Sequence, residues 1–414
     1  MISALEAHKL IQETQIPDGV ISRKIVSVSS SLGLYLAEDI FAKRNQPPFN
    51  RSMMDGIALS SEGSSKREFK SEGVARAGFS QTRLTDAKRC IEVMTGAPVP
   101  IGCDIVVPYE EVINNDDLFR FQSTSYNPKK GQFIHTEASD YKVGDKLLEK
   151  GIVIDSTIIS LLYSVGLEKV EVLDIQSIAI VSTGDELRDV GSAISPHQIY
   201  KSNPFAISSE LKAFFPSINV ELFHFNDDED EVLSGLSNLL SNYKFIIISG
   251  GVSKGKYDYI PSALKSLGVK EVFHKVKQRP GKPLWFGRAE HGQVVFGLPG
   301  NPVSSLVNTR RHIIPLLESA INEGIRSSYL VKSALNLEIG SSFTHFLPVR
   351  LNVSKGVITV RPVLGNNSGD FSKLIHSDGF IEVPADEGEI VQGELYEFFP
   401  WGSLDRRLGT HGHE

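Results

Sequence analysis

Short apolar runs alternate with stretches of helical spacing in the middle of the chain. Ile178–Val181 and Phe245–Ile248 are apolar runs of strand length, and Val220–Phe225 is a candidate for a further strand. Between them, apolar residues mark one face of a helix: Val232, Leu233, Leu236, Leu239 and Leu240. Strands that alternate with helices predict an α/β domain with a mostly parallel sheet. A ligand crevice is then expected at the carboxyl ends of its strands.

The flanking segments show the pattern of β structure. Glycine, proline and short runs such as Ile105–Val107 are typical of a β-rich module. Near the C-terminus, the alternation in Val357–Val360 predicts a small β-domain. The capping box Ser3-Ala4-Leu5-Glu6 predicts an N-terminal helix, and a second helix is expected around Ile158. We expect four parts: a linker part (1–45, completed by 140–172), a β-rich domain (46–139), an α/β domain (173–326) and a C-terminal β-domain (327–414).

Composition narrows the class of protein. The 414 residues are 41% hydrophobic and 22% charged, which is typical of a globular protein. A net charge of −7 argues against nucleic acid and anionic membranes as partners. No signal peptide or membrane span is evident. Cys90 and Cys103 suggest no disulfide framework, which favours a cytoplasmic protein.

Three glycine loops close apolar runs between residues 249 and 302, and we interpret them as an anion cradle. Glycine lets backbone N–H groups approach a phosphate closely. The loops are Ser249–Gly255 with Gly250, Gly251 and Ser253, Arg279–Pro283 with Gly281, and Gly297–Pro302 with Pro299 and Gly300. Asn301-Pro302 also predicts the start of a helix, whose N-terminus favours anions.

Carboxylates follow two of the predicted strands. Asp258 follows the glycine loop after the strand Phe245–Ile248, where it can hold Mg²⁺ beside a phosphate, although the glycine pair is also compatible with a simple turn. Glu186, in Ser182–Glu186, ends the first strand, and a turn is again the alternative. The histidines show no metal-ligand spacing, and the terminal His411 and His413 read as a frayed tail.

Four cations lie within eight residues of this acidic chain: Lys275, Lys277, Arg279 and Lys282. In a strand, residues 275, 277 and 279 would share one face, which a solvated edge strand also explains. Their proximity to the glycine loops favours an anion site. Without any resemblance, the residues predict an α/β enzyme that positions a phosphorylated, nucleotide-like anion with cations and Mg²⁺, by electrostatic stabilisation.

Taken in order, six motifs closely resemble the molybdopterin molybdenumtransferases, the MoeA and gephyrin E-domain family. The motifs are Pro48–Gly56, Met94–Pro100, Ser182–Leu187, Ser249–Ser253, Pro280–Pro283 and Leu298–Pro302. The resemblance implies an elongated homodimer that takes adenylylated molybdopterin and molybdate. Such enzymes cleave the adenylyl pyrophosphate with a divalent cation and release molybdenum cofactor and AMP. Other proteins of molybdenum cofactor biosynthesis are then candidate partners.

The resemblance also implies roles for individual residues. It gives as active-site positions Asp55, Thr95, Glu186, Asp258, Lys275, Arg279, Lys282, Arg350 and Ser368. The cations would hold molybdate and phosphates. Glu186 and Asp258 would carry Mg²⁺. Asp228 falls near a further acidic position of the family, but a helix N-terminus is an equal alternative there.

Several positions depart from the family pattern. Arg279 stands where many members have lysine, and Lys201 and Asn50 each replace a usual aspartate. Lys254 and Lys256 make their loop more basic, and His135–Asp140 lacks the usual Arg and Gly-Glu. The sequence leaves open a non-catalytic scaffold or cofactor-carrier paralogue, another nucleotide-dependent phosphotransferase, and tungstate in place of molybdate.

Overall fold

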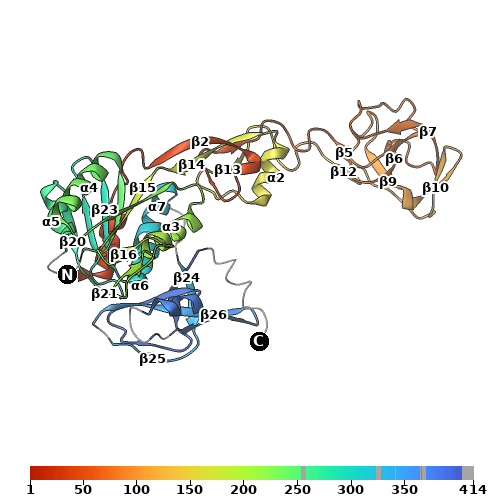
Figure 1. Cartoon of the computed structure of the whole chain (residues 1–414). Coiled ribbons are helices and arrows are strands. Elements are labelled where there is room, and N and C mark those ends of the chain that lie inside the picture. Colours follow the sequence, from red (N-terminus) through yellow and green to blue (C-terminus); the bar gives the residue numbers. More distant parts are fainter. Residues whose placement is uncertain (253–257, 323–327, 341, 364, 366–369, 403–414) are drawn as a thin grey trace. The chain divides into compact units, whose positions relative to one another are not determined.

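The computed structural model describes residues 1–252, 258–322, 328–340, 342–363, 365 and 370–402, and the chain forms two compact units (Figure 1). The first unit consists of Met1–Glu38, Lys150–Ser160 and Glu168–Glu414. The second consists of Asp39–Glu149 and Leu161–Leu167. Helix α2 (Ser156–Ser164) contributes residues to both.

A six-stranded sheet forms the centre of the first unit. Its order is β18 (Val220–Phe225), β15 (Ile178–Thr183), β19 (Phe245–Ser249), β23 (Val294–Leu298), β22 (Trp285–Arg288) and β20 (Lys270–His274). The first four strands are parallel, β22 is antiparallel to β23, and β20 is antiparallel to β22. The prediction of a mostly parallel α/β sheet is therefore confirmed.

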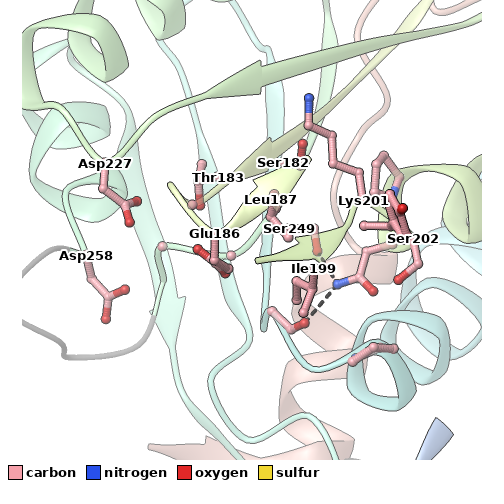
Figure 2. A pocket seen from close by; sticks show the side chains of 18 residues that line it. Ser182, Thr183, Glu186, Leu187, Ile199, Lys201, Ser202, Asp227, Ser249 and Asp258 are labelled. Carbon is pink, nitrogen blue, oxygen red and sulfur yellow. Dashed lines mark hydrogen bonds between the residues drawn. The ribbon is translucent and has the colours of Figure 1, made fainter. Parts of the chain in front are cut away.

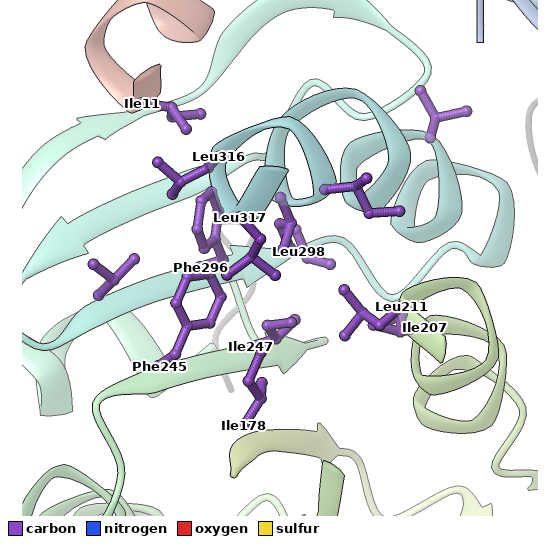
Figure 3. Close-up of a cluster of buried hydrophobic side chains, with 14 of the residues drawn as sticks. Ile11, Ile178, Ile207, Leu211, Phe245, Ile247, Phe296, Leu298, Leu316 and Leu317 are labelled. Carbon is purple, nitrogen blue, oxygen red and sulfur yellow. The ribbon is translucent and has the colours of Figure 1, made fainter. Parts of the chain in front are cut away.

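Helices cover both faces of this sheet, because successive apolar side chains of a strand point to opposite sides. Ile178 and Ile247 belong to the core that contains residues of α1 (Ala4–Gln12), α3 (Asn203–Phe214), α6 (Pro302–Asn308) and α7 (Ile314–Ile321) (Figure 3). Their neighbours Ala179 and Ile248 pack on the other side, with α4 (Glu229–Asn242) and α5 (Ile260–Ser266). Each fully buried isoleucine contributes about 1.5–3 kcal/mol.

The predicted helix starts are also confirmed. Ser3 caps α1 and accepts a hydrogen bond from the Glu6 N–H at 3.1 Å. Asn301 caps α6 and accepts one from the Ser304 N–H at 3.0 Å, with Pro302 in the first turn.

A seven-stranded sheet follows, in the order β1 (Ile2–Ser3), β21 (Val276–Arg279), β26 (Thr344–Ser354), β27 (Val357–Pro362), β24 (Tyr329–Ser333), β30 (Leu395–Pro400) and β28 (Gly379–Val383). Because β26 also pairs with β28, the last five strands close a ring around a core that includes Val349 and Phe398. The predicted small C-terminal β-domain is thus present. It also contains the pair β25 (Leu337–Glu338) and β29 (Glu389–Ile390), and the short helix η4 (Phe371–His376).

A π-helical turn, η3 (Thr309–Ile313), joins α6 to α7 and fastens the C-terminal β-domain to the α/β domain. The buried Arg310 donates from Nε to the Pro400 carbonyl oxygen at 2.8 Å and stacks over Phe214 at 4.4 Å. Arg311 forms an ion pair with Glu382 at 2.6 Å. The helical segment and the last strands therefore form one packed body.

Two small sheets complete the first unit. In one, β14 (Lys169–Ile175) pairs antiparallel with β2 (Ile21–Ser27) and β3 (Tyr35–Leu36), and the short helix η1 (Val28–Ser30) follows β2. In the other, β16 (Leu187–Arg188) runs parallel to β17 (Ile199–Tyr200).

The second unit is rich in strands, as its pattern predicts. One sheet has the order β10 (Val112–Asn115), β11 (Leu118–Phe121), β7 (Glu68–Ala75), β8 (Cys90–Val93), β6 (Gly56–Leu59) and β9 (Ile105–Pro108). The remaining elements are the pairs β5 (Arg51–Ser52) with β12 (Ile134–His135) and β4 (Ile40–Phe41) with β13 (Lys146–Leu148), and the short helix η2 (Tyr109–Glu111). Cys90 and Cys103 are free thiols, and burial raises the pKa of each to about 12.

Candidate active site

A cavity of about 340 Å³ opens at the carboxyl ends of the parallel strands (Figure 2). Its lining includes Thr183 at the end of β15, Ser249 at the end of β19 and Gly300 after β23. The chain passes from β15 to β18 on one side and then returns to add β19 on the other. The loops after β15 and β19 therefore diverge, which creates the crevice that such sheets use for ligands.

Two glycines form the floor of this cavity. Gly250 has φ +102° and Gly251 has φ +66°, a region that favours glycine. A Cβ atom at Gly250 would lie 2.7 Å from Thr183 Oγ1, and one at Gly251 would lie 2.8 Å from Ile260 Cγ1. The loop therefore requires glycine at both positions and brings bare backbone to the ligand space. His274 Nε2 lies 2.8 Å from the Val252 carbonyl oxygen and ties this loop to β20.

Three carboxylates line the cavity: Glu186, Asp227 and Asp258. Glu186 and Asp258 are predicted site residues that the fold brings to one cavity, whereas Asp227 was missed. The neighbouring Asp228 instead caps α4 and accepts a hydrogen bond from the Glu231 N–H at 2.9 Å. Asp228 therefore has the position at a helix N-terminus that the sequence offers as the alternative to a metal-binding role.

The carboxylates repel one another. Burial raises the pKa of Asp227, a hydrogen bond from the Asp185 N–H partly opposes this, and the charges of Asp185, Glu186 and Asp258 raise the pKa further. Nearby negative charges have this effect because they penalise the ionised form. A divalent cation would relieve the repulsion, and carboxylate oxygens are the ligands that Mg²⁺ prefers.

The donor set fits Mg²⁺ in a particular way. In the part of the chain that the structure describes, no three His, Cys, Asp or Glu side chains are grouped closely enough to hold a metal by themselves. Mg²⁺ usually retains waters and binds one or two carboxylates together with substrate phosphates. Glu186, Asp227 and Asp258 suit that mode, with a phosphorylated ligand completing the coordination.

Asn203, which sequence reasoning missed, joins the two glycine loops. Its Nδ2 donates to Ser249 Oγ and to the Gly300 carbonyl oxygen, both at 2.9 Å. The Pro299 carbonyl oxygen accepts a hydrogen bond from the Ser305 hydroxyl, which holds the third loop on α6. In the sequence, Asn203 is marked only by its position two residues after Lys201.

Lys275 lies at a corner between two sheets. It has φ +72°, a strained conformation for a lysine, and it separates β20 of the central sheet from β21 of the seven-stranded sheet. The Lys275 N–H donates to the Leu284 carbonyl oxygen at 2.8 Å, and the Lys275 carbonyl oxygen accepts from the Ile2 N–H at 3.3 Å. The expectation that residues 275, 277 and 279 share one strand face is wrong for Lys275, because the strand begins at Val276. Lys277 and Arg279 are exposed and alternate with buried residues.

Gln278 supports the loop that carries Gly281 and Lys282. This buried carboxamide donates from Nε2 to Asn308 Oδ1 at 2.7 Å and to the Gly281 carbonyl oxygen at 3.3 Å. His312 Nε2 lies 3.4 Å from Gln278 Oε1. A Cβ atom at Gly281 would lie 2.7 Å from both amide nitrogens, so the tight loop depends on glycine.

The predicted cations do not line this cavity. Among the described lining residues, none of Lys275, Arg279, Lys282 and Arg350 occurs. Arg279 pairs in register with His345, and Arg350 lies on β26. The predicted site residues of the first unit that the structure describes therefore separate: Glu186, Asp258, Gly250, Gly251 and Gly300 line the cavity, whereas Gly281 and the four cations, called here the cationic group, do not.

Asp55 and Thr95 form a pair in the second unit. The Thr95 N–H and hydroxyl donate to Asp55 Oδ1 at 2.6 and 3.0 Å, and these hydrogen bonds lower the pKa of Asp55. Asp55 thus remains ionised at neutral pH. Ser253 and Ser368, both predicted site residues, lie outside the described residues, as do Lys254 and Lys256.

A glycine-lined crevice with carboxylates, at the switch point of a mostly parallel sheet, is typical of α/β enzymes that bind phosphorylated ligands. The MoeA N-terminal region (domain I and II) matches residues 2–166, the probable molybdopterin binding domain matches 179–319, and the MoeA C-terminal region (domain IV) matches 331–401. The chain belongs to the molybdopterin molybdenumtransferase family, the MoeA-type enzymes of molybdenum cofactor biosynthesis.

Relatives match along nearly the whole chain. A molybdopterin molybdenumtransferase from Synechocystis is 38% identical over 97% of this chain and 100% of the relative. One from Staphylococcus epidermidis is 30% identical over 96% of this chain and 94% of its own. A crystal structure of a molybdopterin biosynthesis MoeA protein from Pyrococcus horikoshii has 26% identity and a TM-score of 0.81, with 98% of this chain and 100% of that chain covered. In the described residues, no helix is long and apolar enough to cross a membrane.

Proposed function

We propose that this enzyme inserts molybdate into adenylylated molybdopterin in a Mg²⁺-dependent reaction that releases AMP. An oxygen of water or of molybdate bonds to the adenylyl phosphorus as the P–O bond to the phosphate of molybdopterin breaks. AMP leaves with one phosphate, and the pterin keeps the other.

The cavity at the ends of β15 and β19 is the observation that carries this proposal. Its glycine loops offer backbone to phosphate oxygens, and Glu186, Asp227 and Asp258 offer ligands to Mg²⁺. When bound, Mg²⁺ would offset the charge of the pyrophosphate. The residues of this chain orient the substrate and exclude water from part of its surface. The cationic group (Lys275, Arg279, Lys282 and Arg350) is suited to hold molybdate and phosphates. Its positive charges attract these anions, and the arginines add bidentate hydrogen bonds.

We also propose that the protein is a cytoplasmic homodimer. Within one chain, the cationic group does not line the carboxylate cavity. A second copy that presents its cations, Arg350 among them, would complete the site. From the family resemblance, Asp55, Thr95, Ser253 and Ser368 are proposed as active-site residues as well. Other proteins of molybdenum cofactor biosynthesis are candidate partners for transfer of the substrate and product.

The experiment combines purified protein with adenylylated molybdopterin, Mg²⁺ and molybdate, and follows AMP. Release that depends on both Mg²⁺ and molybdate supports the proposal. No release, with the pterin still bound, would favour a scaffold or cofactor-carrier role. Nucleotide turnover without pterin would favour another phosphotransferase, and the same assay with tungstate would establish the preferred oxyanion.

A further inference from the structure

Lys201 places a positive charge on the side of the cavity that lies opposite Asp227 and Asp258. Among the described lining residues, three are acidic, and Lys201 is the single cation. Figure 2 shows Asp227 and Asp258 on one side of the cavity and Lys201 on the other. Any anionic ligand in this space meets repulsion from the carboxylate side, so a cation on the opposite side orients it.

The backbone of Lys201 is fixed from both directions. Its N–H donates to the Arg188 carbonyl oxygen at 2.9 Å and extends the pairing of β16 with β17. Two residues later, Asn203 joins both glycine loops. The segment that carries Lys201 is therefore hydrogen-bonded to the glycine loops that line the cavity.

The side chain of Lys201 is only 13% exposed, and its Nζ lies 3.0 Å from Asp189 Oδ1. Asp189, in contrast, is 80% exposed. An ion pair with such a solvated carboxylate contributes little, so a phosphate can replace it. The charge of Lys201 also acts on His224 of β18. Burial lowers the pKa of this histidine, and the charge of Lys201 lowers it further.

We propose that Lys201 is a substrate-binding residue that donates to a phosphate oxygen of the ligand, and that Asp189 positions the lysine before the ligand arrives. This inference rests on the proposed function and adds an element to it: the substrate's phosphate is held between Mg²⁺-binding carboxylates and a protein cation. The sequence alone marks Lys201 only as a departure from the family pattern.

The test measures binding of AMP and of adenosine to the full-length protein by calorimetry. Lys201→Met removes the charge and keeps much of the length, and we expect AMP to bind about tenfold more weakly or worse, the scale of a lost charge-assisted hydrogen bond. Adenosine, which lacks the phosphate, should bind equally to both proteins. Lys201→Arg should retain most AMP affinity, and Lys212→Met, at an exposed position of α3, should behave like the parent.

Three outcomes would overturn the inference: equal AMP affinity in Lys201→Met and the parent, an equal loss for AMP and adenosine, or a parent that binds no AMP. A parent that binds AMP through Lys201 but releases none from adenylylated molybdopterin would contradict the proposed function and leave the lysine assignment supported.

Discussion

Asp185 and Asp227, 42 residues apart, each accept a hydrogen bond from the backbone N–H of the other. The Asp227 N–H donates to Asp185 Oδ1 at 3.1 Å, and the Asp185 N–H donates to Asp227 Oδ2 at 3.5 Å. This reciprocal pair joins the loop after β15 to the loop after β18. It keeps the Asp227 carboxylate at the cavity, where the neighbouring negative charges act on it.

Mg²⁺ affinity should therefore depend on pH through Asp227. The pKa of this carboxyl is raised, so it takes up a proton at a higher pH than an ordinary aspartate, and the protonated form does not bind metal. We expect Mg²⁺ affinity to fall as the pH decreases through that raised value. Calorimetric titrations at a series of pH values check this, and Asp227→Asn should flatten the dependence. An unchanged slope in Asp227→Asn would exclude this residue.

Asp258→Asn should strongly reduce AMP release and leave the melting temperature nearly unchanged, because the carboxylate lines the cavity. Asp228→Asn is the matched control. Asparagine caps a helix about as well as aspartate, so stability should be preserved. Normal AMP release in Asp228→Asn would limit that residue to capping α4, whereas a large loss would support the metal role. Normal turnover in Asp258→Asn would remove its assignment.

Lys275→Gly should separate stability from anion binding. Glycine adopts φ +72° without strain, so the free energy of unfolding should rise by up to about 1 kcal/mol, whereas Lys275→Ala should give no such gain. Both variants should bind molybdate more weakly by roughly 1.5–3 kcal/mol. Lys355→Gly, at φ +49° in the turn after β26, should gain stability without loss of binding. Unchanged molybdate affinity in both Lys275 variants would contradict the assignment.

Gln278→Met should lower the free energy of unfolding by about 1–3 kcal/mol, because buried hydrogen-bonding groups lose their partner. It should also weaken anion binding, since the loop that bears Lys282 loses its support. The comparison is Gln293→Met, which removes a buried carboxamide that donates to the Leu240 carbonyl oxygen at 2.9 Å. That variant should lose stability and keep its anion affinity, as measured by denaturation and calorimetry. Equal anion affinities in the two variants would contradict a positioning role for Gln278.

Mixing two inactive variants tests the proposed dimer. If Arg350 completes the partner's cavity, heterodimers of Asp258→Asn and Arg350→Ala chains contain one intact site and one doubly damaged site. After complete random exchange, AMP release should recover to about a quarter of the parental rate. Absence of recovery, with exchange demonstrated by differently tagged chains, would place the site within one chain or exclude Arg350 from it.

The central sheet was predictable because strands buried on both faces are continuous apolar runs, as in Ile178–Val181 and Phe245–Ile248. The sequence could not show that Asp227 lines the cavity and that Asp228 does not. Adjacent residues of the same type differ only in their backbone direction, and that direction is set by competition between a helix cap and a distant partner. The left-handed backbone of Lys275 could not be predicted either, because a lysine in the sequence does not indicate such a conformation.

Sequence spacing also could not show that the cations lie apart from the cavity. Arg279 lies on β21, which leaves the central sheet and pairs with β1 at the N-terminus and with β26 of the C-terminal β-domain. Such pairings join residues that are far apart in sequence, and no local pattern reports them.

The placement of β21 limits how this chain can be divided or rearranged. Residues 276–279 lie between Ile2–Ser3 and the beginning of β26. A fragment that ended before residue 327 would leave one edge of β21 without its partner, and exposed strand edges promote aggregation. Exchange of the C-terminal β-domain with that of a relative would have to preserve this register. The three sequence regions that match separate families are therefore not three interchangeable modules.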